Sequence, residues 1–287
     1  MLFRIAPTPS GYLHLGNAVN FVLTWLAARQ RGAQLLLRID DLDAGRKRPE
    51  YVDDVFRTLD FLGLDYDLGP ASADAFEAQW SQRHRTEHYQ ATLNQLREAG
   101  TLYASDLSRR EWKAYEPTYL TEDRITSLSL DALEVTWRFK ADGDGSSDFV
   151  VRRRDGLPAY QIASLTDDHL FGVTHLVRGI DLIDSTDRQR QLALALGWRN
   201  FLKAHVWHHS LLLGPDGLKL SKSAGGGAIA RQSVRPLRER GNVPDVVFGH
   251  VARLLNAPSE ANHTLDDLLE WGVPDHFFTP VQTVKLS

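Results

Sequence analysis

The sequence contains no cysteine, and this absence excludes two kinds of stabilisation. Without thiols the chain forms no disulfide, and it has no thiolate with which to hold a metal ion. Long apolar runs are missing too, since none approaches the roughly 20 residues that a membrane-spanning helix needs. The N-terminus also lacks the basic region, apolar stretch and cleavage site of a secretory signal. We therefore expect a cytoplasmic protein that does not bind membranes.

A strong net charge is also missing, because the formal charge at pH 7 is only -4. The hydrophobic content of 43% and charged content of 24% are ordinary for a globular protein, so nothing draws the whole chain to nucleic acid. RNA binding would require a local basic patch. The candidate clusters are Gly45–Pro49, Arg109–Arg110, Arg152–Arg154 and the C-terminal stretch 231–240. An RNA contact and an ordinary solvated basic face are equal alternatives for each cluster.

The first third of the chain alternates between strand and helix patterns. Leu2–Ala6 and the continuous apolar run Gln34–Ile39 are typical of strands covered on both faces. A helical pattern after the first strand ends at Gly32, and a second begins at Pro49 and ends at Gly63. This alternation predicts an α/β fold with a doubly wound parallel sheet.

The rhythm changes after a third predicted helix over Trp80–Ala99. The dipeptide Asp155–Gly156 predicts a hairpin turn between two strands, and Ser185 is placed to cap a helix. Four segments follow from these patterns. They are 1–100, the first half of the core; 101–160, an inserted small α+β domain; 161–230, the second half of the core; and 231–287, a short helical C-terminal region.

The stretch PTPSGYLHLGN forms a turn between the first strand and the first helix. In an open α/β sheet, ligands bind at the carboxyl ends of the strands, and a helix N-terminus there attracts anions. Gly11 and Gly16 allow a ligand to approach closely, and His14 adds a donor that can face a phosphate. Taken alone, a histidine near such a turn is more often structural.

A second stretch, GPDGLKLSKSAGG, places two lysines three residues apart in a glycine-rich loop. Lys219 and Lys222 could reach a polyphosphate and neutralise the charge that builds as a P–O bond breaks. The alternative is a solvated loop with scattered lysines. That alternative is weaker here because lysine is scarce in this chain compared with arginine.

Together the two stretches resemble the signature motifs of class I aminoacyl-tRNA synthetases. His14–Asn17 (HLGN) is similar to the first motif, and Lys219–Ser223 (KLSKS) to the second, with leucine for the commoner methionine. Longer segments resemble the glutamyl-tRNA synthetase family, in that family's order, over most of residues 3–225. They are RIAPTPSGYLHLGN, LLLRIDDLDAGRKRP, LGLDYD, DFVVRRRDGLPAYQ, TDDHLFGVTHLVRGIDLIDSTDRQ and LLLGPDGLKLSKS.

The resemblance implies a Rossmann-like core that activates glutamate with ATP and Mg2+ and transfers it to tRNA. It assigns catalysis to His14 and Lys222. The ATP site would comprise His14, Gly16, Asn17, Lys219, Ser221 and Lys222, and the glutamate site Arg4, Thr8, Ser10, Asp40, Tyr160 and Arg178. The insertion would be an acceptor-binding-like domain. The chain also stops short of the family's anticodon-binding region, as is typical of the glutamyl-Q subfamily, which uses the queuosine of tRNA(Asp). A monomer is expected.

The sequence departs from the family's pattern at two places. The family has glutamate in RIED, where its carboxylate contacts the amino group of the substrate, and Asp40 stands there with a shorter side chain. Glutamyl-Q enzymes commonly bind zinc through cysteines in the insertion, but Ser105 and Leu107 occupy the first two positions, so no zinc is expected. Tyr115 and Tyr119 are expected to hold the insertion by packing instead.

The histidine-rich stretch His205–His209 is not interpreted as a metal site either. On a strand, adjacent side chains face opposite sides, and the first and last of these histidines would stand roughly 13 Å apart. Two alternatives to the glutamate reading stay open. The first is a stand-alone paralogue that adenylates another amino acid or uses another acceptor, and the second is a non-catalytic RNA-binding paralogue. Intact His14 and Lys222 argue against the second.

Overall fold

The computed structural model describes residues 1–114, 122, 128–141, 147–212, 233–240, 244–257 and 263–284. The chain forms two compact units. The first unit comprises Met1–His84, Val173–Ile183 and Lys203–Thr283, and the second comprises Arg85–Gly172, Asp184–Leu202 and Val284–Ser287. The finer division into four segments stays a prediction.

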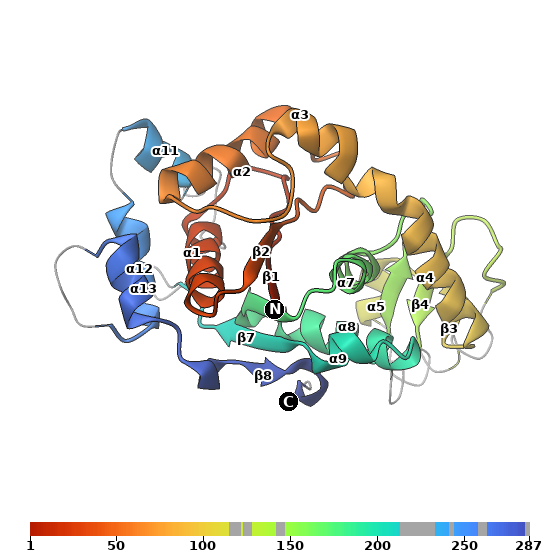
Figure 1. The fold of residues 1–287 in the computed structure, drawn as a ribbon. Helices are drawn as coiled ribbons and strands as arrows, with labels where there is room; N and C mark the ends of the chain where they lie inside the picture. Colours follow the sequence, from red (N-terminus) through yellow and green to blue (C-terminus); the bar gives the residue numbers. More distant parts are fainter. Residues whose placement is uncertain are drawn as a thin grey trace. The chain divides into compact units, whose positions relative to one another are not determined.

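The first unit contains a five-stranded sheet in the order β2-β1-β6-β7-β8 (Figure 1). The strands are β1 (Leu2–Ile5), β2 (Gln34–Leu37), β6 (His175–Gly179), β7 (His205–His209) and β8 (Thr279–Pro280). The first four are parallel, and β8 runs antiparallel to β7. The predicted parallel α/β sheet is therefore confirmed. Because the chain passes from β1 to β2 on one side and later adds β6 on the other, the carboxyl end of β1 is a switch point where ligands bind.

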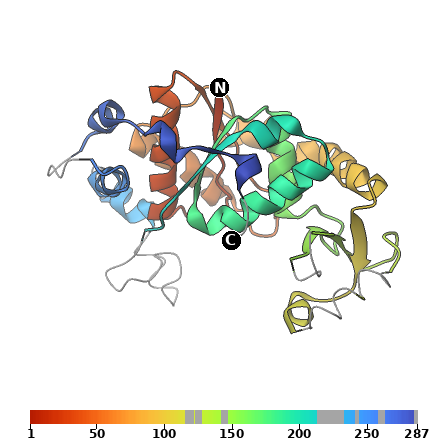
Figure 2. The same cartoon turned by 90° about the horizontal axis from the view of Figure 1, so that it is seen from below.

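Helices cover the sheet of the first unit as the sequence pattern predicts. They include α1 (Leu15–Gln30), which joins β1 to β2, and α2 (Pro49–Leu62), which follows β2. Proline opens α2, and Gly63 ends it with a φ of 71° in the left-handed region. The shorter helices α11 (Val234–Glu239), α12 (Asp245–Leu254) and α13 (Leu265–Trp271) come later, and Figures 1 and 2 both show α12 and α13 beside α1.

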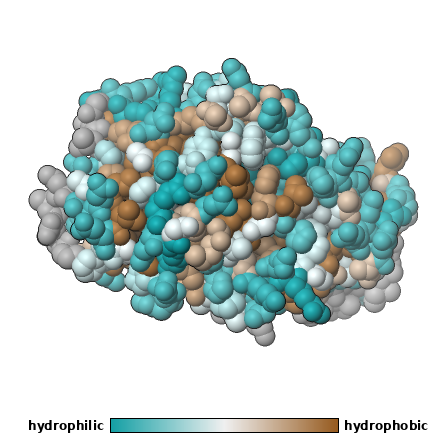
Figure 3. Space-filling view, in the orientation of Figure 1, coloured by the Kyte–Doolittle hydropathy of each residue, from teal (hydrophilic) through white to brown (hydrophobic). Residues whose placement is uncertain are grey.

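The visible face of the molecule is mainly polar. In Figure 3 hydrophilic residues predominate, and hydrophobic residues form small groups between them. Among the described parts of the chain, no helix is both long enough and apolar enough to cross a membrane. The longest described helix, α1, has 16 residues, whereas a membrane span needs about 20.

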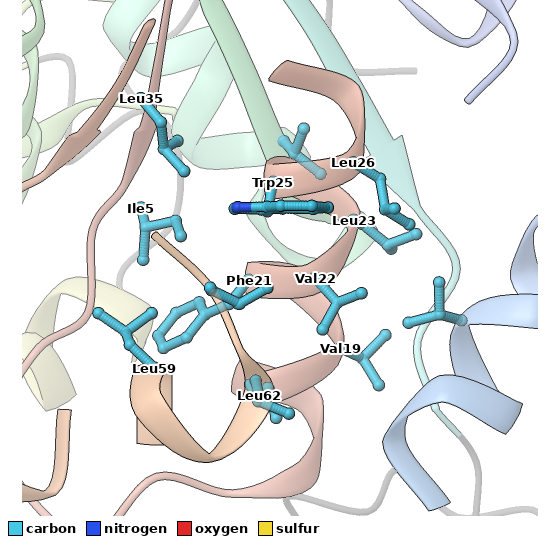
Figure 4. Packing of buried hydrophobic residues seen from close by; sticks show 14 of the residues in the cluster. Ile5, Val19, Phe21, Val22, Leu23, Trp25, Leu26, Leu35, Leu59 and Leu62 are labelled. Carbon is cyan, nitrogen blue, oxygen red and sulfur yellow. The ribbon is translucent and has the colours of Figure 1, made fainter. Parts of the chain in front are cut away.

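The core of the first unit is built around α1, which is buried on nearly every side. Its buried residues include the continuous run 21–28, so it lacks the polar stripe of a surface helix. Phe21 points toward Ile5 of β1 and Leu59 of α2, while Val19, Val22, Leu23 and Leu26 lie on the opposite side of the helix (Figure 4). The sheet and α2 cover one side of α1, and α12 and α13 contact it elsewhere. A central helix of this kind gives its N-terminus a fixed position.

The helix predicted over Trp80–Ala99 is wrong in its first part. The α-helix of this region, α4, covers only Thr86–Glu98. The backbone N–H of Gln82 and the hydroxyl of Ser81 both donate to the carboxylate of Asp41, at 2.8 and 2.7 Å. These bonds hold Ser81 and Gln82 out of a continuous α-helix.

The second unit contains a three-stranded antiparallel sheet, β3-β4-β5, and several helices. The strands are β3 (Leu102–Ser105), β4 (Thr136–Phe139) and β5 (Phe149–Arg152). The helices are α4, α5 (Arg109–Ala114), α7 (Tyr160–Leu170), α8 (Ile183–Ala195) and α9 (Arg199–Lys203), where Ile183 and Lys203 belong to the first unit. Helices α4 and α7 pack together and share buried polar contacts.

Two local predictions in the second unit need correction. The turn at Asp155–Gly156 is confirmed, with Gly156 at a φ of 85°, but the strand predicted after it is wrong. The ladder is a single bridge between Arg152 and Pro158, after which the Ala159 N–H still donates to the carbonyl of Val151 at 2.8 Å, and it ends because α7 begins at Tyr160. Ser185 is not a cap either, since α8 already begins at Ile183.

Candidate active site

His14 is the N-cap of α1, and its ring is held by the first turn of that helix. Its Nδ1 accepts the backbone N–H of Asn17 at 3.3 Å, while the His14 N–H donates to Asn17 Oδ1 at 3.1 Å. This reciprocal pair is a capping box. A ring nitrogen that accepts a hydrogen bond carries no proton, so Nε2 is the donor nitrogen of a neutral His14. Asn17 thus fixes the imidazole that the sequence predicts to face a phosphate.

Gly16 is needed to make room for the ring of His14. A β-carbon at position 16 would lie 3.1 Å from both Cε1 and Nδ1 of that ring, which is tighter than about nine in ten real contacts of this kind, so the ring would have to shift by a few tenths of an ångström. At Gly11, by contrast, a β-carbon would meet no atom within 4 Å. The two glycines of the turn therefore differ. Gly16 leaves room for the ring of His14, whereas Gly11 borders open space.

Asp40 lies against the turn that follows β1. Its backbone N–H donates to the carbonyl of Pro7 at 2.8 Å, two residues after Arg38 N–H donates to the carbonyl of Ile5. The predicted glutamate-binding residues of the turn, Thr8 and Ser10, are both exposed. The structure therefore brings Asp40 and the turn together at the carboxyl ends of β1 and β2.

The carboxylate of Asp40 forms a two-pronged ion pair with Arg38. Arg38 Nε donates to Oδ1 at 2.7 Å, and Nη2 donates to Oδ2 at 3.1 Å. Arg38 is 2% exposed and Asp40 6%, so the pair is buried. Arg38 was not among the residues predicted for the site. The signal was present, because residues two apart in an extended segment point to the same side.

Two further arginines are buried in neighbouring strands of the sheet. Arg4 lies on β1 and is 5% exposed, and Arg178 lies on β6 and is 2% exposed. Arginine is rarely buried so completely unless it meets an anionic or polar partner, and its planar fork suits a carboxylate. The structure places these two predicted residues on strands that pair with each other in parallel.

His208 on β7 lies directly opposite Arg178 in the sheet register. Burial, with smaller contributions from Arg178 and His209, lowers the pKa of His208 to about 4. At neutral pH the imidazole beside Arg178 is therefore uncharged. In the sequence this histidine stood out only as part of a stretch weighed as a metal site, and its position beside Arg178 was not predicted.

His209 has a structural role that links α1 to the sheet. Asn20 Nδ2 donates to His209 Nε2 at 3.1 Å and to the carbonyl of Val177 at 3.2 Å, while His209 Nδ1 lies 2.9 Å from the carbonyl of Ser210. Burial lowers the pKa of His209 as well. In the described ranges, no group of three or more His, Cys, Asp and Glu side chains could hold a metal ion.

The remaining predicted residues do not all fall within the described ranges. Lys219, Ser221 and Lys222 belong to the stretch 213–232 and lie outside them, as do Tyr115 and Tyr119. Tyr160 is described, and it is the first residue of α7 in the second unit, 42% exposed. The roles of all these residues stay predictions.

Ser105 and Leu107, at the positions of the family's cysteines, are buried within the second unit. Ser105 Oγ accepts the N–H of Leu107 at 3.3 Å. On β4, the central strand of the same sheet, the guanidinium of Arg138 stacks on the ring of Trp112 at 3.4 Å from its centroid. Apolar packing and cation–π contact therefore stabilise this part of the insertion.

The described basic clusters are largely matched by acidic neighbours. In the cluster Gly45–Pro49, Arg46 pairs with Asp43, and Lys47 pairs with Asp41 and Glu77. In the cluster Arg152–Arg154, Arg153 pairs with the adjacent Asp155. These local ion pairs reduce the positive field that either cluster could offer to RNA.

Comparison with known proteins agrees with this geometry. The family described as "tRNA synthetases class I (E and Q), catalytic domain" matches residues 1–127 and 131–267. A glutamyl-Q tRNA(Asp) synthetase of Symbiobacterium thermophilum is 37% identical over 284 residues, covering 88% of this chain and 85% of that protein. A glutamate–tRNA ligase of Acidithiobacillus ferrooxidans is 33% identical over 278 residues, covering 88% of this chain but 56% of that protein.

The solved structures show the same fold. A glutamate–tRNA synthetase from Elizabethkingia anophelis matches with a TM-score of 0.71 at 21% identity, covering 99% of this chain and 66% of that one. A glutamate tRNA ligase from Elizabethkingia meningosepticum matches with a TM-score of 0.67. Both likenesses support the Rossmann-like core expected for class I enzymes. The chain therefore belongs to the family of class I tRNA synthetases (E and Q), and it is a ligase of the aminoacyl-tRNA synthetase type.

Proposed function

We propose that this enzyme activates glutamate with ATP and Mg2+ and transfers the glutamyl group to the queuosine of tRNA(Asp). The observation that carries the activation step is the capping box, which holds His14 at the N-terminus of α1 with Nε2 as its donor. The choice of glutamate is supported by relatives of both names, glutamyl-Q tRNA(Asp) synthetase and glutamate–tRNA ligase. The acceptor is supported only by the name glutamyl-Q tRNA(Asp) synthetase. A second relative with this name, from Synechococcus sp., is 38% identical to this chain.

In the proposed reaction, the carboxylate of glutamate attacks the α-phosphorus of ATP, and pyrophosphate leaves. No protein nucleophile is required, so the enzyme acts by positioning and electrostatic stabilisation. His14 Nε2–H donates to a phosphate oxygen, and the amides and dipole at the N-terminus of α1 add positive potential. Lys222 neutralises further negative charge on the phosphates. Mg2+ bound together with ATP would supply further positive charge at the phosphates.

The glutamate pocket would use the two buried arginines of the sheet. Arg4 would pair with the side-chain carboxylate of glutamate through both arms of its guanidinium, and Arg178 would contribute a second positive group. Thr8 and Ser10 would add further polar contacts. Because His208 is uncharged at neutral pH, it adds no further positive charge beside Arg178.

Asp40 would bind the amino group of glutamate. A carboxylate offers about four lone-pair positions, so it can accept both bonds from Arg38 and still accept an ammonium N–H. Arg38 would orient the carboxylate without consuming all of its capacity. The shorter reach of aspartate gives the second candidate function, in which the chain adenylates a different amino acid.

ATP–pyrophosphate exchange without tRNA tests the activation step. Glutamate, aspartate, glutamine and a blank without amino acid are compared, and labelled glutamate is then offered to tRNA(Asp) with queuosine, tRNA(Asp) without it, and tRNA(Glu). Exchange with glutamate and labelling of queuosine-containing tRNA(Asp) alone is the expected result. Exchange with another amino acid, or labelling of tRNA(Glu), would contradict the proposal.

The variant Asp40→Glu separates the two candidate functions. If glutamate is the substrate and the backbone has adapted to aspartate, the longer side chain raises the KM for glutamate by about tenfold, since misplacement of about 1 Å is costly. If glutamate is a poor substrate because Asp40 is too short, the same variant lowers its KM. The KM for ATP serves as the internal control.

A further inference from the structure

The carboxylate of Asp54 on α2 joins two segments that are far apart in the sequence. Oδ2 accepts the backbone N–H of Leu13 at 2.9 Å, and Oδ1 accepts Nη2 of Arg238 at 2.9 Å. Arg238, on α11, also donates from Nη1 to the hydroxyl of Thr58 at 3.2 Å. Asp54 is only 2% exposed, so this charge is committed to its partners.

The carbonyl of Leu13 is held from the other direction by the start of α11. It accepts the N–H of Val234 at 3.0 Å and the hydroxyl of Ser233 at 3.3 Å. Both backbone polar groups of Leu13 therefore have partners from α2 and from the start of α11. We call Asp54, Arg238, Ser233 and Val234 the Leu13 clasp.

An adjacent contact reinforces the same connection. The guanidinium of Arg235 on α11 lies 4.6 Å from the centre of the Tyr12 ring, one residue before Leu13. Contacts of this kind contribute about 0.5–1 kcal/mol at exposed sites. Tyr12 and Leu13 are thus both tied to α11, immediately before the residue that caps α1.

The backbone of residue 13 determines where the cap begins. His14 has the extended backbone of an N-cap, with φ −101° and ψ 168°, and its ring can reach the Asn17 amide only from that conformation. Asp54 itself contacts neither the ring of His14 nor any residue of the predicted glutamate pocket through a bond described above. Its effect on the ring must pass through the Leu13 peptide.

We propose that Asp54 and Arg238 are positioning residues, which hold the Leu13 peptide so that the imidazole of His14 keeps its orientation toward ATP. The proposal rests on the proposed function of His14. A purely structural role would make the same bonds stabilise the fold without affecting turnover. The two roles differ in kinetics and in the state of the His14 ring.

The test compares Asp54→Asn with a control variant in the second unit, Asp148→Asn. Asp148 is 4% exposed and likewise accepts one backbone N–H, from Ala141 at 2.8 Å, and one side-chain donor, the Tyr103 hydroxyl at 2.8 Å. Both variants should lower Tm. Only Asp54→Asn should lower the kcat of glutamate-dependent exchange, by about 10–100-fold, with the KM for glutamate within about twofold.

Arg238 provides the second arm of the test. Arg238→Gln should reproduce the loss of kcat, and Arg238→Lys should retain more of it, because lysine keeps a positive charge opposite Asp54 but cannot reach both of Arg238's partners. All rates are measured at least 10 °C below the Tm of the variant, so that unfolding does not contribute.

A spectroscopic readout is independent of activity. Long-range 1H–15N spectra of the imidazoles report which ring nitrogen is protonated, and the signal of His14 is assigned from its loss in His14→Gln. We expect the Nε2–H form in the wild type and in Asp148→Asn, and a loss of this preference in Asp54→Asn.

The outcomes separate the clasp from the proposed function. If the wild type exchanges with glutamate but Asp54→Asn keeps its kcat within about twofold, or loses no more than Asp148→Asn, the clasp is only structural and the proposal is wrong. If the wild type catalyses ATP–pyrophosphate exchange with none of the amino acids tested, the proposed function is wrong. In that case the spectra alone decide whether Asp54 orients the ring.

Discussion

In the first unit the buried carboxylates of Asp41 and Asp54 accept hydrogen bonds from backbone amides of turns and connections, namely Gln82 and Leu13. In the second unit the buried carboxylate of Asp167 accepts side-chain donors on neighbouring elements. Arg85 Nε lies 2.8 Å away and the Tyr89 hydroxyl 2.9 Å away. The first arrangement fixes the path of the backbone around the candidate site. The second connects α7 to α4 and to Arg85, the residue immediately before α4.

A buried carboxylate can therefore fix the path of the backbone in one place and hold neighbouring helices together in another. Burial opposes the charge of Arg85, but the adjacent Asp167 outweighs it and raises the pKa of that guanidinium. Burial and the same carboxylate raise the pKa of Tyr89. We therefore expect changes in the first unit to appear mainly in turnover, and changes around Asp167 to appear mainly in stability.

The largest effect is expected for Asp167→Ala. Removing one partner of a buried ion pair leaves the other charge without its counter-ion, and the free energy of unfolding should fall by about 3–5 kcal/mol. Denaturant titration measures this change. Because that variant could fail to fold, Tyr89→Phe provides a milder version with a loss of about 1 kcal/mol. If the kcat of Tyr89→Phe falls by much more than the loss of folded protein explains, changes in the second unit also affect turnover. That result would contradict the expected difference between the two units.

His14→Ala should reduce the rate of glutamate-dependent exchange by about 10²–10³-fold, as is usual when one donor to a developing charge is lost. Loss of the cap should cost only about 1 kcal/mol of stability. Exchange kinetics and thermal unfolding are measured on the same preparation. Normal exchange in this variant would remove His14 from the mechanism.

Gly16→Ala should lower kcat by about tenfold while leaving stability equal or slightly higher. The new methyl group meets the ring of His14 at 3.1 Å and must displace it, whereas alanine is favoured over glycine in a helix by about 0.5–1 kcal/mol. Gly11→Ala is the control, because its β-carbon would meet no atom within 4 Å. Equal activity of the two variants would show that the position of the ring tolerates the shift.

The smallest effect concerns pH. His208 has a pKa of about 4 in the folded chain, below its ordinary value of 6.5, so the unfolded chain binds the proton more readily. Stability from this group is complete above pH 6.5 and is lost as the pH falls toward 4. His175, which burial and its neighbour His205 also shift to about 4, acts in the same direction. Thermal unfolding of His208→Gln should therefore vary less over this range than that of the wild type.

Local patterns predicted the elements that local forces determine. The proline and glycine at the ends of α2, the apolar run of β2 and the turn at Gly156 each act within a few residues, so the sequence revealed them. The strand expected after that turn was wrong, because α7 begins at Tyr160, two residues after the bridge between Arg152 and Pro158. Here the start of a helix limited the pairing to one bridge despite a favourable pattern.

The site was predictable only in part, for a related reason. Resemblance identified His14, Arg4 and Arg178 as candidates, and the spacing of residues 38 and 40 could have revealed their ion pair. No local pattern could have joined Asp54 to Arg238, since 184 residues separate them and only the packing of α2 against α11 brings them together. Contacts of this kind follow from the tertiary fold.

The capping box also bears on the entropy of substrate binding. An exposed histidine that must be ordered by its ligand loses side-chain freedom at that moment, at a cost of about 0.5–1.5 kcal/mol for an immobilised side chain. Here Asn17 restricts the rotation of the His14 ring as soon as α1 forms. The ring is therefore ordered during folding, so under the proposed function a phosphate would meet an imidazole whose rotational freedom has already been lost.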